Sequence, residues 1–168
     1  MKNILTAIYS KFTGSDLSSY VGGRIYLDQA PDNCEFPYVV YFVVSSTPDD
    51  VFCQKGKQTL IQFSLFSANT SAVEVADLYD SLRTLFDDAF IEISIHETDG
   101  VRYYTIDGYL ADGSYLADGI YFAGYNDILL WMHEVNLTTM VEDITVADGV
   151  QSVKAWHADY EVITQVSA

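Results

Sequence analysis

The sequence predicts an α+β fold in which two amphipathic helices pack on one face of a mainly antiparallel sheet. Two segments carry apolar residues at helical spacing, and several others alternate apolar and polar residues with the period of a strand. At 168 residues the chain is long enough for one domain with a substantial core and too short for two. We therefore expect a single domain over residues 1–168, with a β-rich insertion at residues 98–148.

The first helix is expected from Asn3 to Phe12. Its apolar stripe consists of Ile4, Leu5, Ile8, Tyr9 and Phe12. Thr13-Gly14-Ser15 ends this helix, and residues 17–21 suggest one loose helical turn before the Gly22-Gly23 pair.

Two strands are expected after the glycine pair. The first is short, Arg24–Leu27. The second is Tyr38–Ser46, which follows a polar loop ending in Pro37 and begins with the apolar, β-branched and aromatic run Tyr38–Val44. Thr47-Pro48-Asp49-Asp50 is expected to turn the chain, so that Asp49–Gly56 forms an exposed loop.

A strand, a helix and another strand come next. Lys57–Ser67 alternates with the period of a strand, and its buried face is expected to be Ile61, Phe63 and Leu65. A helix is expected to open at Asn69-Thr70-Ser71 with a Ser71–Glu74 capping box. It runs to about Asp88, and its core stripe is Val75, Leu78, Leu82, Leu85 and Phe86. Phe90–His96 is then a strand with alternating isoleucines.

The segment 98–148 is rich in Tyr and is punctuated by four Asp-Gly pairs, of which the first is Asp99-Gly100. These pairs are typical of tight hairpin turns, because both residues tolerate positive φ. A calcium site is the alternative, but the spacing of a calcium loop is not met and no bidentate Glu stands at the required position. The pattern favours turns.

Two further strands complete the sheet. Ile128–Met140 is expected to be a buried strand, with a short helix as the alternative, and Thr145–Gly149 a turn. Val153–Gln165 is expected to be the last strand. Its core face is Trp156, Ala158, Tyr160 and Val162, and its wet face is Ala155, His157, Asp159 and Glu161.

The charge of the chain argues against nucleic-acid binding. There are 24 acidic and 8 basic residues, which give a formal net charge of −16, whereas phosphate contacts need Lys and Arg. Solubility or a salty habitat is the general explanation of such acidity. The longest apolar run is about half of what a membrane helix needs, and no signal peptide is recognised, so we expect a soluble cytoplasmic product with no membrane contact. Cys34 and Cys53 are expected to be free thiols.

No motif for catalysis, nucleotide binding or metal binding occurs in the sequence. The three histidines, His96, His133 and His157, are isolated from one another and lie in expected strands. His157, Asp159 and Glu161 would share one strand face and have groups capable of acid–base chemistry, but a solvated strand face is the favoured interpretation. We expect no enzyme activity, no catalytic residue, no cofactor and no metal.

One family resemblance stands out. It is carried by Val21-Gly22-Gly23-Arg24-Ile25-Tyr26, by Ala30-Pro31, and by Phe36-Pro37-Tyr38-Val39-Val40-Tyr41. The N-terminal helix, the strand–helix pair 60–88 and the closing Trp156–Val162 run complete it. Together these features resemble the tail-completion, or tail-terminator, proteins of long-tailed bacteriophages. The resemblance covers about residues 3–97 and, more weakly, 150–165; the insertion at 98–148 departs from the family pattern.

The resemblance implies a structural virion protein. Such a subunit forms a ring, typically a hexamer, at the head-proximal end of the tail, where it ends tube growth and joins the tail to the head connector. Its implied partners are further copies of itself, the major tail-tube protein and the neck connector. DNA passes through the ring without specific binding, and assembly takes place in the host cytoplasm. Strand edges and the loops 28–35 and 49–56 are the candidate contact surfaces.

Two alternatives remain at this stage. One is another neck or head-completion subunit of the same virion. The other is an acidic cytoplasmic binding domain unrelated to phage.

Overall fold

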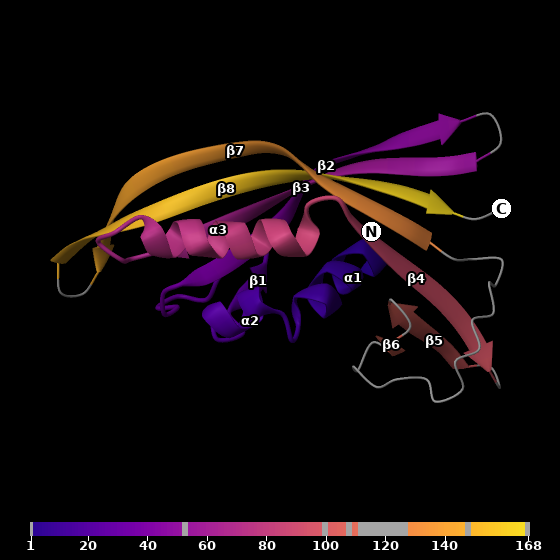
Figure 1. Cartoon of the computed structure of the whole chain (residues 1–168), viewed down its shortest axis with the longest axis horizontal. Coiled ribbons are helices and arrows are strands. Elements are labelled where there is room, and N and C mark those ends of the chain that lie inside the picture. Colours follow the sequence, from indigo (N-terminus) through magenta and orange to yellow (C-terminus); the bar gives the residue numbers. More distant parts are fainter. Residues whose placement is uncertain are drawn as a thin grey trace.

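The computed structural model describes residues 2–51, 54–98, 101–106, 109–110, 128–146 and 149–166. Its helices and strands are α1 (Lys2–Phe12), α2 (Asp16–Tyr20), β1 (Ile25–Leu27), β2 (Tyr38–Val51), β3 (Gln54–Ser67), α3 (Val73–Phe86), β4 (Ala89–Thr98), β5 (Val101–Ile106), β6 (Tyr109–Leu110), β7 (Ile128–Val146) and β8 (Gly149–Val166). The helices lie on one side of the sheet (Figure 1). The predicted α+β class is confirmed.

All the described strands belong to one sheet, in the order β1-β2-β3-β8-β7-β4-β5-β6. Every pairing is antiparallel except that of β1 with β2, which is parallel. The last strand, β8, lies between β3 and β7, so the end of the chain closes the centre of the sheet. The strands predicted at 24–27, 57–67, 90–96 and 153–165 are all present.

Helix α1 forms where it was predicted, but its buried stripe includes Ala7 and leaves out Tyr9, and Leu5 is only partly buried against the core. Ile4, Ala7, Ile8 and Phe12 are buried, which is the i, i+3, i+4, i+8 spacing of a single helix face. Tyr9, which we assigned to the stripe, is 53% exposed. The predicted extra turn is α2, whose N-cap residue Ser15 accepts a hydrogen bond at Oγ from the Ser18 amide at 3.1 Å.

The predicted capping box of α3 does not form. The N-cap residue is Ala72, so Ser71 stands one position too early to cap the helix and Glu74 is only the second helical residue. The Glu74 carboxylate instead accepts a hydrogen bond from Ser67 Oγ, and Ser71 Oγ accepts one from the Val73 amide at 3.2 Å. The core stripe is confirmed: Val75, Leu78, Leu82 and Phe86 are buried, and Leu85 is partly buried against the core.

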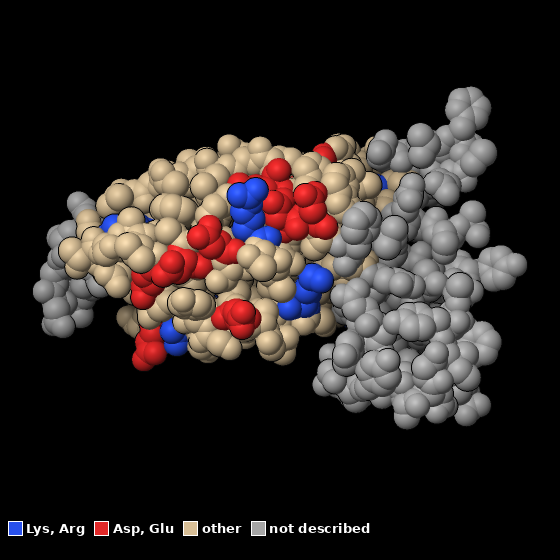
Figure 2. All heavy atoms as spheres, viewed as in Figure 1, with Lys and Arg blue, Asp and Glu red and all other residues tan. Residues whose placement is uncertain are grey.

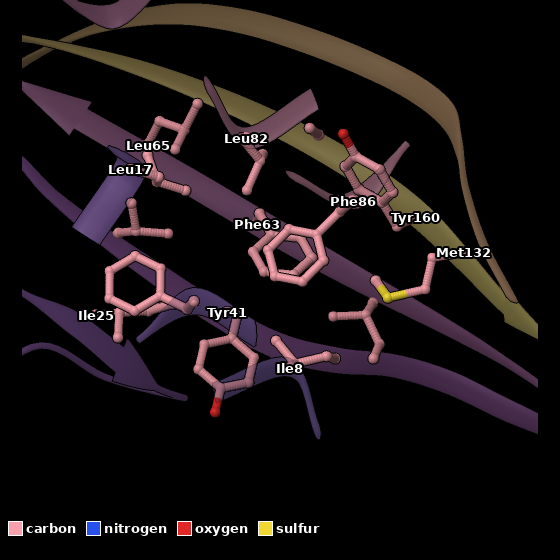
Figure 3. Close-up of a cluster of buried hydrophobic side chains, with 14 of the residues drawn as sticks. Ile8, Leu17, Ile25, Tyr41, Phe63, Leu65, Leu82, Phe86, Met132 and Tyr160 are labelled. Atoms are coloured by element: carbon pink, nitrogen blue, oxygen red, sulfur yellow. The ribbon is translucent and has the colours of Figure 1, made fainter. Parts of the chain in front are cut away.

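The core lies between the helices and the facing side of β2, β3 and β8 (Figure 3). Phe63 is at its centre. Its ring stacks with those of Tyr41 and Phe86, at centroid distances of 5.8 and 5.1 Å, and meets the Tyr160 ring edge-on at 5.5 Å. The predicted inward positions Ile61, Phe63 and Leu65 are all fully buried.

The turn predicted at Thr47–Asp50 and the loop predicted at 49–56 are wrong. β2 runs on to Val51 and β3 starts at Gln54, with Pro48 opposite Lys57 in the ladder. β1 pairs only with Val39–Tyr41, so the rest of β2, including Pro48, is an edge strand of the described sheet. An edge strand tolerates proline, because the hydrogen bond that proline cannot donate has no neighbouring strand to accept it. Cys34 is a free thiol, and Cys53 lies outside the described residues.

Ile128–Val146 is a strand, and the helical alternative is wrong. β7 pairs with β8 along its whole length and with β4 at its beginning, so this part of the expected insertion is a central strand of the sheet. Met132 is buried, whereas Val135, Met140 and Val141 are exposed, so the strand is less buried than we predicted. The turn at 145–149 is shorter than predicted, because Val146 and Gly149 pair with each other. All four Asp-Gly pairs lie outside the described residues, and so do the turn and calcium interpretations that rest on them.

Candidate assembly surfaces

A polar network fastens α3 to β7. Tyr79 Oη donates to the Glu134 carboxylate at 2.7 Å, and Arg83 Nε lies 3.0 Å from Asp87 Oδ2 and 3.8 Å from the Glu134 carboxylate. Asp87 Oδ1 also accepts a hydrogen bond from the Glu134 amide at 3.1 Å. The network fixes the C-terminal half of α3 on the sheet.

The network also shifts the titration of its members. Burial and then the hydrogen bond to Glu134 raise the pKa of Tyr79 to about 12. The hydrogen bond from the Glu134 amide lowers the pKa of Asp87, and Arg83 lowers it further. Both shifts favour the protonation states that hold the network together at neutral pH.

The helix side of the molecule carries a concentration of acidic side chains. Figure 2 shows Asp and Glu in patches around α3, separated by a few basic side chains. Asp16, Asp77, Asp80 and Asp88 are exposed there. An open hollow of about 260 Å³ between α2 and α3 includes Asp16 and Asp80 in its lining, but a shallow hollow with two carboxylates has no further feature of a ligand site.

The opposite side of the sheet has no helix over it among the described residues (Figure 1). We call this side the open face. An apolar row crosses it, because Tyr38, Phe66, Ala155 and Met140 are partners in register on β2, β3, β8 and β7. The Tyr38 and Phe66 rings stack at 4.8 Å. The rings of Tyr26 and Phe36 extend the row, at centroid distances of 6.4 and 5.2 Å from Tyr38.

Polar pairs lie beside the apolar row on the open face. His157 Nδ1 is 2.8 Å from Ser64 Oγ. Asp159 accepts hydrogen bonds from Gln62 at 2.6 Å and from Asn136 at 3.1 Å. These contacts are made across the sheet, to residues of β3 and β7.

A third cross-strand group includes Glu161. Its carboxylate accepts a hydrogen bond from Gln58 and lies 3.2 Å from His133 Nε2, while the His133 ring stacks on Trp131 at 4.4 Å. The three residues considered for acid–base chemistry, His157, Asp159 and Glu161, therefore share a face as predicted but engage different neighbours. Their geometry is that of cross-strand pairs that stabilise a sheet.

The loop at residues 28–35 is exposed, as predicted, but its ends are fixed. Arg24 Nε donates to the Pro37 carbonyl at 3.1 Å, and Arg24 Nη1 lies 3.6 Å from the Glu35 carboxylate. Cys34 Sγ contacts Tyr26 Oη at 3.4 Å. The other predicted contact loop, 49–56, is the end of the β2–β3 hairpin.

Among the described residues, no group of His, Cys, Asp and Glu side chains has the arrangement of a metal site. No helix in the described ranges is long and apolar enough to cross a membrane. The surface feature that the sequence reading missed is the open face. The segment Tyr38–Val44 indicates this face, because its side chains are apolar on both sides of the strand, whereas a strand with one side in water alternates apolar and polar residues.

Comparison with known proteins adds three findings. A family described as "Tail completion protein gp17" matches residues 6–107, which is more than half of the chain. Among curated proteins, no sequence matches significantly. A chain in the solved structure titled "Virion of native gene transfer agent (GTA) particle" aligns with 96% of this chain and 92% of its own length, at 10% identity and a TM-score of 0.46.

Proposed function

Because the chain belongs to the tail completion protein gp17 family, a family of structural phage tail proteins, we propose that it is the subunit of a ring at the head-proximal end of a phage tail. In this position it ends growth of the tail tube and joins the tail to the head connector. The family match over residues 6–107 is the observation that carries the proposal.

The proposed partners follow from that position. The subunit contacts further copies of itself in a ring, which we propose to be a hexamer, the last ring of the tail-tube protein, and the neck connector. It is made in the host cytoplasm and resides in the virion at the tail–neck junction. A closed ring requires a heterologous contact, in which two different surfaces of each subunit meet.

The charge suits a subunit that lines or borders a DNA channel. An acidic wall repels phosphates and lets a duplex slide, whereas Lys and Arg would hold it. The net charge of −16 and the exposed carboxylates around α3 support this assignment. DNA is then cargo that passes through the ring and is not a bound ligand.

The task requires a fixed shape and no bond-breaking chemistry. The Phe63-centred core and the α3–β7 network supply that rigidity. The side chains with acid–base potential on β8 are engaged in cross-strand pairs. The family assignment argues against the alternative of an unrelated acidic binding domain, and leaves another neck or head-completion subunit as the competing position in the virion.

Binding to isolated tails and to isolated heads distinguishes a tail terminator from a head-completion subunit. Purified protein is mixed with isolated tail tubes and, in parallel, with filled heads, and both are imaged by electron microscopy. A tail terminator binds one end of each tube and does not bind heads before a tail is present. Binding to the portal vertex of tail-less heads, with tube ends left bare, would overturn the proposal in favour of a head-completion subunit.

A further inference from the structure

One side of β2 is a strand edge made of residues that form strands readily. β1 covers this side only at Val39–Tyr41, and beyond them Phe42–Thr47 has no strand beside it in the described sheet. We call Phe42–Thr47 the free edge. None of its residues is charged, and Val44, Ser45 and Thr47 are exposed. Such an edge offers backbone N–H and C=O groups on which another chain can pair as a strand.

Pro48 lies at the end of the free edge and is opposite Lys57 in the β2–β3 ladder. The Lys57 carbonyl accepts a hydrogen bond from the Thr164 hydroxyl at 3.0 Å, so this carbonyl points toward β8 and away from β2. Opposite residues of an antiparallel pair direct their backbone groups either toward each other or both away. The nitrogen of Pro48 therefore faces the free-edge side, where it has no hydrogen to donate.

A β-bulge interrupts the free edge nearer its middle. The register of β2 against β3 shifts between Val43 and Ser45, and Val44 is left without a partner and 48% exposed. A bulge bends its strand and increases the local twist, so a straight incoming strand loses register there. The bulge and Pro48 stand on either side of residues 45–47, and they leave only this short stretch of regular strand open on the free edge.

We propose that Pro48 blocks the addition of a second copy's strand at the free edge, and so keeps subunits from polymerising edge to edge before they assemble. β1 covers one end of this side of β2 and the bulge disrupts its middle, so a ladder has to start in the stretch next to Pro48. There Pro48 removes a donor that an incoming strand needs. Asp49 and Asp50 follow in the sequence and add negative charge at the same end. Pro48 acts on the unassembled subunit, so its role is independent of the proposed ring.

Restoring the missing N–H tests this role. Pro48→Thr supplies the donor in a residue that favours strands, and Pro31→Thr makes the same change at an exposed position in the 28–35 loop. Sedimentation in about 1 M salt reduces the screening length to about 3 Å, so repulsion between the acidic copies does not hide association. We expect Pro48→Thr to self-associate about tenfold or more strongly than the wild type, because each copy in a pair supplies one new backbone hydrogen bond. Pro31→Thr should behave like the wild type.

Amide hydrogen exchange locates the contact. Ser46 lies two residues before Pro48 in the strand, so its amide points to the same side, the free edge. The Tyr41 carbonyl accepts a hydrogen bond from the Asp28 amide at 2.9 Å on the β1 side, so the amide of the next residue, Phe42, points to β3 and is the internal control. In the wild type the Ser46 amide should exchange rapidly and the Phe42 amide slowly. In associated Pro48→Thr the Ser46 amide should slow by about tenfold or more, and slow Phe42 exchange shows that the variant is folded.

A second variant, Pro48→Ala, restores the same N–H with a small side chain and should act in the same direction. Three results would overturn the proposal. One is that both variants associate no more than the wild type. Another is association in which the Ser46 amide keeps exchanging rapidly, because the contact then lies elsewhere. The third is a wild-type protein whose Ser46 amide becomes protected as its concentration rises to about 1 mM, because the edge is then open with Pro48 in place. Tail-tube capping is measured separately, so either the role of Pro48 or the ring position can fail alone.

Discussion

Tyr160 offers a test in which removing a polar atom should stabilise the protein. Its side chain is fully buried beside Phe63, and its hydroxyl has no hydrogen-bond partner among the described residues. The burial that removes water from this hydroxyl also raises the pKa of Tyr160 well above its usual range. A buried hydroxyl without a partner costs roughly 1–3 kcal/mol in lost hydration.

The substitution Tyr160→Phe removes that cost and leaves a small void. A void of about 15 Å³ destabilises by about 0.4 kcal/mol at about 24 cal/mol per Å³. The free energy of unfolding should therefore rise by about 1–2 kcal/mol. Urea denaturation at neutral pH measures it, as an increase in the midpoint with an unchanged slope.

Tyr79→Phe is the matched control, because it removes a hydroxyl that does have a partner. Tyr79 donates to both Glu134 oxygens, at 2.7 and 2.8 Å, and its ring contact with Trp156 is kept. A hydrogen bond to a charged group contributes about 1.5–3 kcal/mol, so this variant should lose stability. If Tyr160→Phe is also destabilised, the Tyr160 hydroxyl has a partner in solution and the reasoning is refuted.

Three further substitutions test the core, the α3–β7 network and a helix cap. Phe63→Ala removes the ring at the centre of the core and should cost about 3–5 kcal/mol in denaturant unfolding; a loss below about 1 kcal/mol would contradict the packing described. Folding lowers the pKa of Asp87 from 3.8, so the stability that its carboxylate contributes is present above pH 3.8 and is lost as the pH falls through the lowered pKa. Asp87→Asn should therefore be less stable than the wild type by about 1 kcal/mol at pH 7, and the difference should shrink as the pH falls below 3.8. A difference that does not change with pH would exclude a charge effect. Ser15→Ala should cost about 1 kcal/mol through the lost cap of α2, whereas Ser19→Ala, at an exposed position, should be near neutral in thermal unfolding.

Much of the fold could be predicted because its signals are local. The spacing of Val75, Leu78 and Leu82 identifies α3, and the alternation of Ile61, Phe63 and Leu65 identifies β3. The misses also have local causes. Pro48 beside two aspartates has the composition of a turn. At Pro48, however, β2 pairs only with β3 in the described sheet, so the amide hydrogen that proline lacks is not needed for a second neighbouring strand.

Strand order and the open face depended on contacts that the sequence pattern does not encode. The pairing of β3 with β8 joins residues about 100 positions apart, and nothing in either segment specifies the other. For the same reason, the alignment of Tyr38, Phe66, Ala155 and Met140 into one row appears only once four strands are in register. The sequence predicts a wet face at residues 155, 157, 159 and 161. Ala155 is instead fully buried, and the three polar residues lie in cross-strand pairs.

The length of tail tubes tests the central claim most directly. Tail-tube protein is polymerised with and without this protein, and tube lengths are measured by electron microscopy. The ring assignment predicts that added wild-type protein stops elongation and leaves a ring at one end of each tube. Tubes that keep growing to the same lengths, with bare ends, would contradict it.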